Sequence, residues 1–423
     1  MVGAIQNQSA KNAALPIMAA CLMVGGITKL TDVPDIEDIN RMVELLESIG
    51  VKIVRPDKGV MILDVPTKLS LKTLNPKACD IRSSLDLLGA LAARESKYKL
   101  YKSGGCKLGK RTIRPIVYAL QKLGIEIESK EDYYEVHNKN LKASTVVMYE
   151  SGDVATNIAV MASVMAAGTT VIKMASANYM VQDLCCFLNK MGAKITGIGT
   201  TTLTIEGVKK LAPISDSYPI MPDPIVAMTY ITAAIVTGSQ VTIKNCPLEF
   251  LELELLKLEV MGQKFNLKNK RLSANGLFDI VDIELHPSSL VAAPDKLECR
   301  PFPGLNIDNL PLFIPIVATA SGRTLIHDWV YEDRALYSLE LKKLGVAITL
   351  IDIHRVWVEG PTDFKPNEVI CPSGIRPAVN VLLCMLGAKG KSILRNTYVI
   401  ERGYENLYET LNKAGADIEV VSE

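Results

Sequence analysis

The segment Ser103-Gly-Gly-Cys106-Lys-Leu-Gly-Lys-Arg111 places one cysteine among three glycines and three cationic side chains. Nearby positive charge favours the thiolate form, so we expect Cys106 to be a reactive thiol. The glycines predict a mobile loop whose backbone N–H groups can cradle a phosphate. The segment matches neither GxxxxGK[ST] nor GxGxxG, so it does not predict a standard nucleotide loop. The simpler interpretation is a surface cysteine in a flexible turn.

A lysine and an asparagine stand at the start of an apolar segment near the N-terminus, in Gln8-Ser-Ala-Lys11-Asn12-Ala-Ala-Leu-Pro16. If this segment is a helix, its free N–H groups and its dipole attract an anion there, and the lysine adds charge. Lys11 and Asn12 are therefore candidate ligands of an anionic substrate. The alternative is a solvated lysine.

Four arginines recur in similar positions, at or near the predicted starts of helices. They are Arg82 in CDIRSS, Arg334 in EDR, Arg376 in SGIRP and Arg402 in IERGYE. A single arginine of this kind is usually a surface residue. Several that converge would bind phosphate and carboxylate groups in a bidentate manner.

A proline-rich loop, Arg300-Pro-Phe-Pro-Gly-Leu-Asn306-Ile-Asp308, precedes an apolar helix predicted over residues 313–320. Asp308 is either the N-cap of this helix or a general base that faces a substrate. The histidines at positions 137, 286, 327 and 354 form no metal-binding or triad spacing, so they are assigned no role.

The composition limits the classes of protein that can hold these residues. The chain has 423 residues, a formal charge of +1, 48% hydrophobic residues and only 5% aromatic residues. This balance predicts an aliphatic α/β core and argues against a nucleic-acid or membrane-surface protein. Nine cysteines without a CxxC motif predict neither disulfides nor zinc, so we expect no metal and a reducing cytoplasm.

One apolar run, from Ala13 to Ile27, contains Met18-Ala-Ala-Cys21 and could be interpreted as a lipoprotein signal. It is shorter than the roughly 20 residues of a membrane span. The same kind of run recurs deep in the chain, so a buried core helix is the better interpretation.

Six segments share one pattern, an amphipathic helix that runs into a glycine and then a short strand. Their glycines are Gly50, Gly124, Gly192, Gly262, Gly345 and Gly415. Each period also contains one apolar helix followed by a turn and a strand. A spacing of about 70 residues is too long for helical repeats or propeller blades, so the pattern predicts six α/β units with a left-handed glycine cap after each amphipathic helix.

Three units precede and three follow Pro219-Ile-Met-Pro-Asp-Pro224, where three prolines oppose regular structure. This division predicts two similar halves with a substrate site in the cleft between them. A plain turn inside one domain is the alternative.

The motifs SAKNAALPI, DIRSS, GGCKLGKR, FP…D, EDR, IR and ERGYE, in this order, resemble the enolpyruvyl transferase family over nearly the whole chain. The resemblance implies an α/β fold of two inside-out domains, each with three βαβαββ repeats. Residues 11–220 would form the first domain, and residues 1–10 plus 221–423 the second.

The most similar branch of the family transfers the enolpyruvyl group of phosphoenolpyruvate to UDP-N-acetylglucosamine, in the first step of peptidoglycan synthesis. The resemblance implies addition followed by elimination of phosphate, without a cofactor. Cys106 would give the proton to C3 and would react with fosfomycin, and Asp308 would take the proton of the acceptor hydroxyl. Asn12 would contact the acceptor. The implied phosphoenolpyruvate ligands are Lys11, Arg111 and Arg402, with Arg82, Arg334 and Arg376 nearby. Such fixed cations would stabilise the departing phosphate.

The nucleotide side of the motifs departs from the family pattern. Arg114 stands where the family has an aspartate, Asp153 interrupts the segment that cradles the nucleotide phosphates, and Gly374 replaces a second aspartate. A different acceptor therefore remains possible, such as another nucleotide or shikimate 3-phosphate, as does a non-catalytic binding relative. A phosphate-cyclase-like relative is disfavoured, because the chain lacks a phosphate loop. We expect phosphoenolpyruvate and a sugar-nucleotide-type acceptor as ligands, and no nucleic acid or membrane partner.

Overall fold

The computed structural model describes residues 1–102, 112–331 and 333–421. These residues form two compact units. One contains residues 9–102 and 112–221, and the other contains residues 1–8 and 222–421. No helix in the described ranges is both long enough and apolar enough to cross a bilayer.

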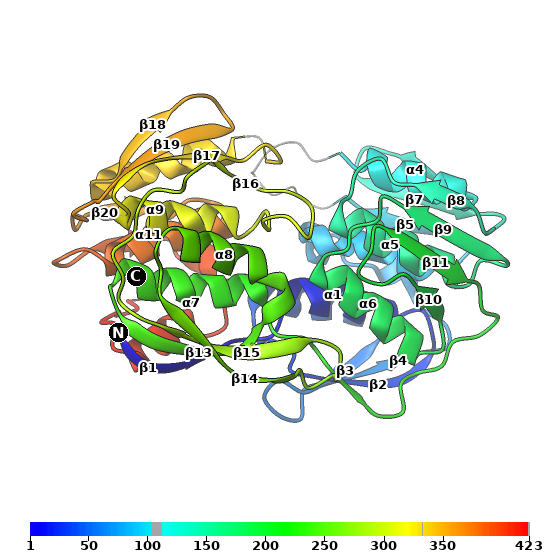
Figure 1. Cartoon of the computed structure of the whole chain (residues 1–423). Helices are drawn as coiled ribbons and strands as arrows, with labels where there is room; N and C mark the ends of the chain where they lie inside the picture. Colours follow the sequence, from blue (N-terminus) through cyan, green and yellow to red (C-terminus); the bar gives the residue numbers. More distant parts are fainter. Residues whose placement is uncertain (103–111, 332, 422–423) are drawn as a thin grey trace. The chain divides into compact units, whose positions relative to one another are not determined.

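The unit of residues 9–221 has sheets on its outside and apolar helices inside (Figure 1). The sheet orders are β12(Ser217–Pro219)-β2(Gly26–Thr31)-β4(Met61–Val65)-β3(Lys52–Val54), β5(Lys97–Tyr101)-β7(Tyr133–Asn138)-β6(Ile125–Ser129) and β10(Lys194–Thr196)-β11(Thr202–Glu206)-β9(Thr169–Lys173)-β8(Thr145–Val147). The α-helices are α1(Lys11–Cys21), α2(Glu37–Ser48), α3(Leu87–Ala92), α4(Arg114–Lys122), α5(Asp153–Ser163) and α6(Tyr179–Lys190). The 3₁₀ helices are η1(Leu71–Thr73), η2(Lys77–Asp80) and η3(Arg82–Asp86).

The first apolar run forms helix α1, the buried core helix that was the preferred interpretation of this segment. Its residues from Ala13 to Cys21 are all buried, as expected for a core helix. Helices α3 and α5 approach so closely that a Cβ on Gly89 would lie 2.5 Å from the Ile158 carbonyl oxygen. Only glycine fits at this crossing.

The second unit has the sheet orders β1(Val2–Gln6)-β13(Gln240–Pro247)-β15(Asp279–Leu285)-β14(Phe265–Leu272), β16(Leu297–Glu298)-β17(Gly322–His327)-β19(Arg355–Gly360)-β18(Ala347–Leu350) and β20(Glu368–Ile370)-β21(Ile393–Arg395). Its α-helices are α7(Pro224–Val236), α8(Glu252–Val260), α9(Phe313–Thr319), α10(Arg334–Tyr337), α11(Ile375–Leu386), α12(Tyr398–Glu401) and α13(Leu407–Lys413). The 3₁₀ helices are η4(Leu248–Phe250), η5(Leu310–Leu312) and η6(Ser338–Leu344).

Helix α7 lies inside this unit, with the β13–β15 sheet outside it (Figure 1). It packs against α9, α11 and β13. Its sequence is apolar around almost the whole circumference, which is typical of a helix that is covered on every side.

The six glycines of the repeated pattern all adopt positive φ, between +85° and +102°. Each follows a helix and provides the left-handed conformation that ends it, so the predicted glycine caps are confirmed. These caps define where each amphipathic helix stops and the chain turns back.

The first strand belongs to the unit of residues 222–421. β1 pairs in parallel with β13, with Val2 opposite Gln240, and the amino group of Met1 donates to Ser239 Oγ at 2.7 Å. The Asn7 amide donates to the backbone carbonyls of Asp223 and Asn245, at 3.0 and 3.1 Å. The chain therefore starts in one unit, builds the other, and returns at Pro222.

Candidate functional site

Lys11 is the first residue of α1, and its side chain is fixed by a carboxylate. Lys11 Nζ lies 2.8 Å from Asp38 Oδ2 of α2, and the two side chains are only 12% and 8% exposed. A nearly buried ion pair of this kind needs both partners. The cation is therefore held at the start of an apolar helix in one defined position.

Asn12 opens a polar chain that joins the starts of three helices. Its amide donates to the Tyr179 hydroxyl at 3.2 Å, and Tyr179 N donates to Asn178 Oδ1 at 2.9 Å. Asn178 Nδ2 in turn donates to Asp153 Oδ2 at 3.2 Å, and Ser176 Oγ donates to Asp153 Oδ1 at 2.5 Å. Helices α1, α5 and α6 thus begin around one connected set of polar groups.

Arg82 is the first residue of η3, and a buried acid lies one turn later. Asp86 is 2% exposed, and its Oδ1 accepts no hydrogen bond from the part of the chain that the structure describes. Burial raises the pKa of Asp86 to about 8, while the Arg82 charge opposes that rise. The acid therefore binds a proton in the folded state well above the usual range.

Asp308 lies in the turn before η5, with a quarter of its side chain exposed. Its Oδ1 is 3.4 Å from Arg334 Nη1, and its backbone N–H donates to Asn306 Oδ1 at 2.8 Å. The residue before η5 is Asn309, and the one before α9 is Leu312, so the N-cap interpretation of Asp308 is wrong. The carboxylate instead faces a guanidinium.

Arg334 is the first residue of α10 and is 4% exposed. Its Nε donates to Asp328 Oδ2, its Nη2 donates to the Ile307 carbonyl at 2.6 Å, and its guanidinium lies 4.3 Å from the centre of the Tyr331 ring. Burial disfavours the charged form, but Asp328, Tyr331 and Asp308 outweigh burial and raise the pKa of Arg334. The guanidinium stays charged inside the unit.

Glu254 of α8 binds the loop that carries Asp308, on the residues at either side of it. It is 3% exposed, and its Oε1 accepts from Asn306 N at 3.2 Å and from Asn309 Nδ2 at 2.8 Å. Burial raises the pKa of Glu254. This residue could not be predicted as part of the site, because a glutamate in the repetitive segment LELELLKLEV resembles an ordinary surface charge.

Arg376 and Arg402 differ in their settings. Arg376 is buried on α11, and its Nη1 donates to the Tyr404 hydroxyl at 2.5 Å, while that hydroxyl lies 2.8 Å from Thr229 Oγ1. Arg402 follows the last residue of α12, so its prediction near a helix start is wrong. Helix α12 ends at Glu401, and the next helix begins only at Leu407.

Not every predicted site residue can be placed. Cys106 and Arg111 lie outside the described residues. The structure brings Asp308 and Arg334 into direct contact, and it places Lys11, Asn12 and Arg82 in the other unit. The described residues contain no group of three or more His, Cys, Asp or Glu side chains that could hold a metal ion.

The sequence matches known proteins over almost its full length. The sequence model of the family described as EPSP synthase (3-phosphoshikimate 1-carboxyvinyltransferase) matches residues 2–411. The UDP-N-acetylglucosamine 1-carboxyvinyltransferase of Treponema denticola is 32% identical, over 99% of this chain and 96% of that protein. The protein of the same name from Hydrogenovibrio crunogenus is 31% identical, over 98% and 96%.

Solved structures share the fold. The enolpyruvyl transferase NikO from Streptomyces tendae superposes with a TM-score of 0.84 at 22% identity, over 99% of this chain and 95% of that one. EPSP synthase from Acinetobacter baumannii gives a TM-score of 0.76 at 20% identity, over 99% and 97%. The predicted resemblance is thereby confirmed, and the chain belongs to the EPSP synthase family of carboxyvinyl (enolpyruvyl) transferases.

Proposed function

We propose that the chain transfers the enolpyruvyl group of phosphoenolpyruvate to a hydroxyl of UDP-N-acetylglucosamine and releases phosphate, the first step of peptidoglycan synthesis. Full-length relatives named for this reaction support the proposal. The observation that carries it is the contact of Asp308 with the buried Arg334, because a partly exposed carboxylate on a rigid support suits a general base.

Each candidate residue has a role in this reaction. Asp308 takes the proton of the acceptor hydroxyl as its oxygen bonds to C2 of phosphoenolpyruvate, and Cys106 protonates C3. Loss of a proton from C3 then expels phosphate and restores the double bond. The cations hold phosphoenolpyruvate and stabilise phosphate as it leaves; they are Lys11, Arg111 and Arg402, with Arg82, Arg334 and Arg376 nearby. Asn12 contacts the acceptor.

We also propose the finer architecture that the sequence pattern implies. Residues 11–220 form one inside-out domain, and residues 1–10 plus 221–423 form the other, each with three βαβαββ repeats. The outer sheets, the inner helices and the six glycine caps support this arrangement. A cytoplasmic location fits the eight described cysteines, all of which are free thiols.

A second candidate is the same transfer to a different acceptor. The Asp153 carboxylate at the start of α5 favours it, because a fixed negative charge there opposes a bound phosphate. Arg114 at the start of α4 is a further change on the acceptor side.

Phosphate release tests both candidates. The protein is incubated with phosphoenolpyruvate and, in turn, with UDP-N-acetylglucosamine, a uridine nucleotide or shikimate 3-phosphate. We expect turnover with the sugar nucleotide and a loss of about 10²- to 10⁴-fold in Asp308→Asn. Turnover with only another acceptor would support the second candidate, and no turnover with any acceptor would support a non-catalytic relative.

A further inference from the structure

The Arg334 guanidinium is shared among three acceptors from different parts of one unit. Nε donates to Asp328, Nη2 to the Ile307 carbonyl, and Nη1 faces Asp308 at 3.4 Å. The exposures are unequal: the side chains of Arg334 and Asp328 are 3% and 6% exposed, and that of Asp308 is 26% exposed. The inner pair is fixed, and Asp308 is the member that solvent or a substrate can reach.

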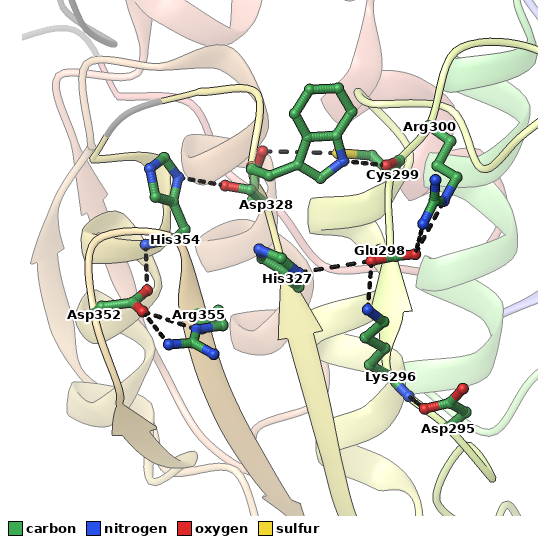
Figure 2. A network of polar contacts seen from close by, with 11 residues as sticks. Asp295, Lys296, Glu298, Cys299, Arg300, His327, Asp328, Asp352, His354 and Arg355 are labelled. Carbon is green, nitrogen blue, oxygen red and sulfur yellow. Dashed lines mark hydrogen bonds and ion pairs between the residues drawn. The ribbon is translucent and has the colours of Figure 1, made fainter.

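Asp328 is itself held from several sides. Its backbone N–H donates to the His354 carbonyl at 2.8 Å, and His354 Nδ1 lies 2.8 Å from the Asp328 carbonyl oxygen. Its Oδ1 accepts from Tyr331 N at 3.4 Å and from Cys299 Sγ at 3.9 Å. Figure 2 shows Asp328 between Cys299 and the turn at His354. A carboxylate held in this way has one orientation, so it can fix the guanidinium that it binds.

We propose that Asp328 is a positioning residue: it shares the Arg334 guanidinium with Asp308 and so fixes the place of the Asp308 carboxylate and limits the positive charge that acts on it. For catalysis this inference rests on the proposed function, in which Asp308 is the base. The sharing of Arg334 rests on geometry alone.

The sign of the effect follows from the charges. Arg334 carries one positive charge between two carboxylates. The negative charge of the inner one, Asp328, offsets part of the attraction that Arg334 exerts on Asp308. If Asp328 loses its charge, the positive charge of Arg334 acts more strongly on Asp308 and weakens it as a base. If the residue at position 334 no longer offers a donor to Asp308, the Asp308 carboxylate loses this stabilising contact. Among the described residues, titratable groups that face this cluster include Tyr331, Cys299 and His354 and, across the Asp308 loop, Glu254.

If Asp328 and Asp308 share Arg334, two substitutions should shift the titration midpoint of Asp308 in opposite directions. Asp328→Asn keeps the shape and removes the charge, so we expect the titration midpoint of Asp308 to fall. Arg334→Lys keeps the charge but offers one donor centre, which the buried Asp328 retains, so we expect the midpoint to rise. The midpoint is measured by NMR on protein with carbon-labelled aspartate carboxyls, and the Asp308 signal is identified by its loss in Asp308→Asn.

Kinetics test the catalytic consequence. We expect Asp328→Asn to lower kcat about tenfold and to shift the low-pH limb of the kcat–pH profile to lower pH. KM for phosphoenolpyruvate should change less than about twofold. Asp279→Asn is the matched control, because Asp279 also pairs with a cation, Lys270, but its side chain is 45% exposed at the start of β15. It is expected to leave the titration and the kinetics unchanged.

The outcomes distinguish the sharing of Arg334 from the proposed function, in which Asp308 is the base. An Asp308 midpoint that stays or rises in Asp328→Asn overturns the sharing, whatever the activity. If Asp328→Asn does not fold, a midpoint that stays or falls in Arg334→Lys overturns it. If the wild type turns over no acceptor, the proposed function fails, while the titration still decides the sharing. If KM rises and kcat does not change, Asp328 supports substrate binding and the positioning role is wrong.

Discussion

The described cysteines are buried or partly buried, and this sets them apart from the cationic sequence around Cys106. Seven of the eight described cysteines are buried, and Cys186 is partly buried. Burial raises the pKa of Cys21 and Cys299 to about 12 and that of Cys186 and Cys371 to about 11. These thiols are protonated at neutral pH, whereas the sequence around Cys106 favours a thiolate.

We therefore predict that limited alkylation, including reaction with fosfomycin, modifies Cys106 first. Phosphoenolpyruvate is expected to slow that reaction, because it occupies the same anion site. Peptide mapping by mass spectrometry after brief exposure to iodoacetamide measures the order of labelling. Earlier labelling of any other cysteine, with Cys186 the nearest competitor by exposure, would contradict the prediction.

The Lys11–Asp38 pair allows stability and substrate binding to be separated. Lys11→Met leaves the nearly buried Asp38 without this cation, so we expect the free energy of unfolding to fall by about 1–3 kcal/mol. Adding Asp38→Asn to Lys11→Met should recover part of that loss. Urea unfolding measures the stability of both variants.

Binding of phosphoenolpyruvate should not recover in the double variant, because the cation itself is missing. Calorimetric titration measures this binding. Recovery of both stability and affinity would show that Lys11 acts only through the fold.

At the scale of elements, helix α7 depends on its first turn. Asp223 is 2% exposed, and its Oδ1 accepts from Ile225 N at 2.7 Å and from Val226 N at 3.2 Å. We predict that Asp223→Ala lowers the free energy of unfolding by about 1–2 kcal/mol. Asp223→Asn keeps an acceptor oxygen and should cost clearly less. Equal losses in urea unfolding would mean that charge, rather than capping, is what α7 requires.

Local patterns predicted the elements better than they predicted the site. The helix–glycine–strand pattern has a local physical cause, the left-handed cap, and the structure contains it at all six glycines. The start of α1 at Lys11 also followed from local sequence. Arg402 was misplaced because the short helix α12 has no strong start or stop signal before Gly403.

The polar supports of Asp308 could not be predicted from sequence. Glu254 lies on a helix more than 50 positions earlier, and Asp328 follows a strand. Whether an acid is buried and which group it meets depend on tertiary packing, which no local pattern records. The contact between Asp308 and Arg334 was not predicted, because the family resemblance gave both residues a place at the site without pairing them.

For the whole molecule, Asp86 predicts a pH dependence of stability. Its pKa rises from 3.8 to about 8 on folding, so between these values the folded state binds more protons than the unfolded state. The free energy of unfolding therefore falls as pH rises through this window. Asp86→Asn cannot ionise, so its stability advantage over wild type should grow with pH, by at most about 1.4 kcal/mol per unit.

Thermal unfolding between about pH 5 and pH 8 measures that advantage. Asp57→Asn, at an exposed loop position, is the control and should follow the wild-type curve. An advantage of Asp86→Asn that is the same at both ends of the range would show that the buried acid does not titrate there.

The position of β1 also has a consequence for synthesis on the ribosome. The strand Val2–Gln6 is made well before its partner β13, which begins at Gln240, after the whole of the other unit. At about 5–20 residues per second, the strand waits roughly 12–48 s before that partner has been made. During translation the unit of residues 9–221 can complete its sheets while the leading segment is still unpaired. A nascent chain halted before β13 therefore carries an unpaired strand that chaperones and proteases can bind until residues 240–247 have been made.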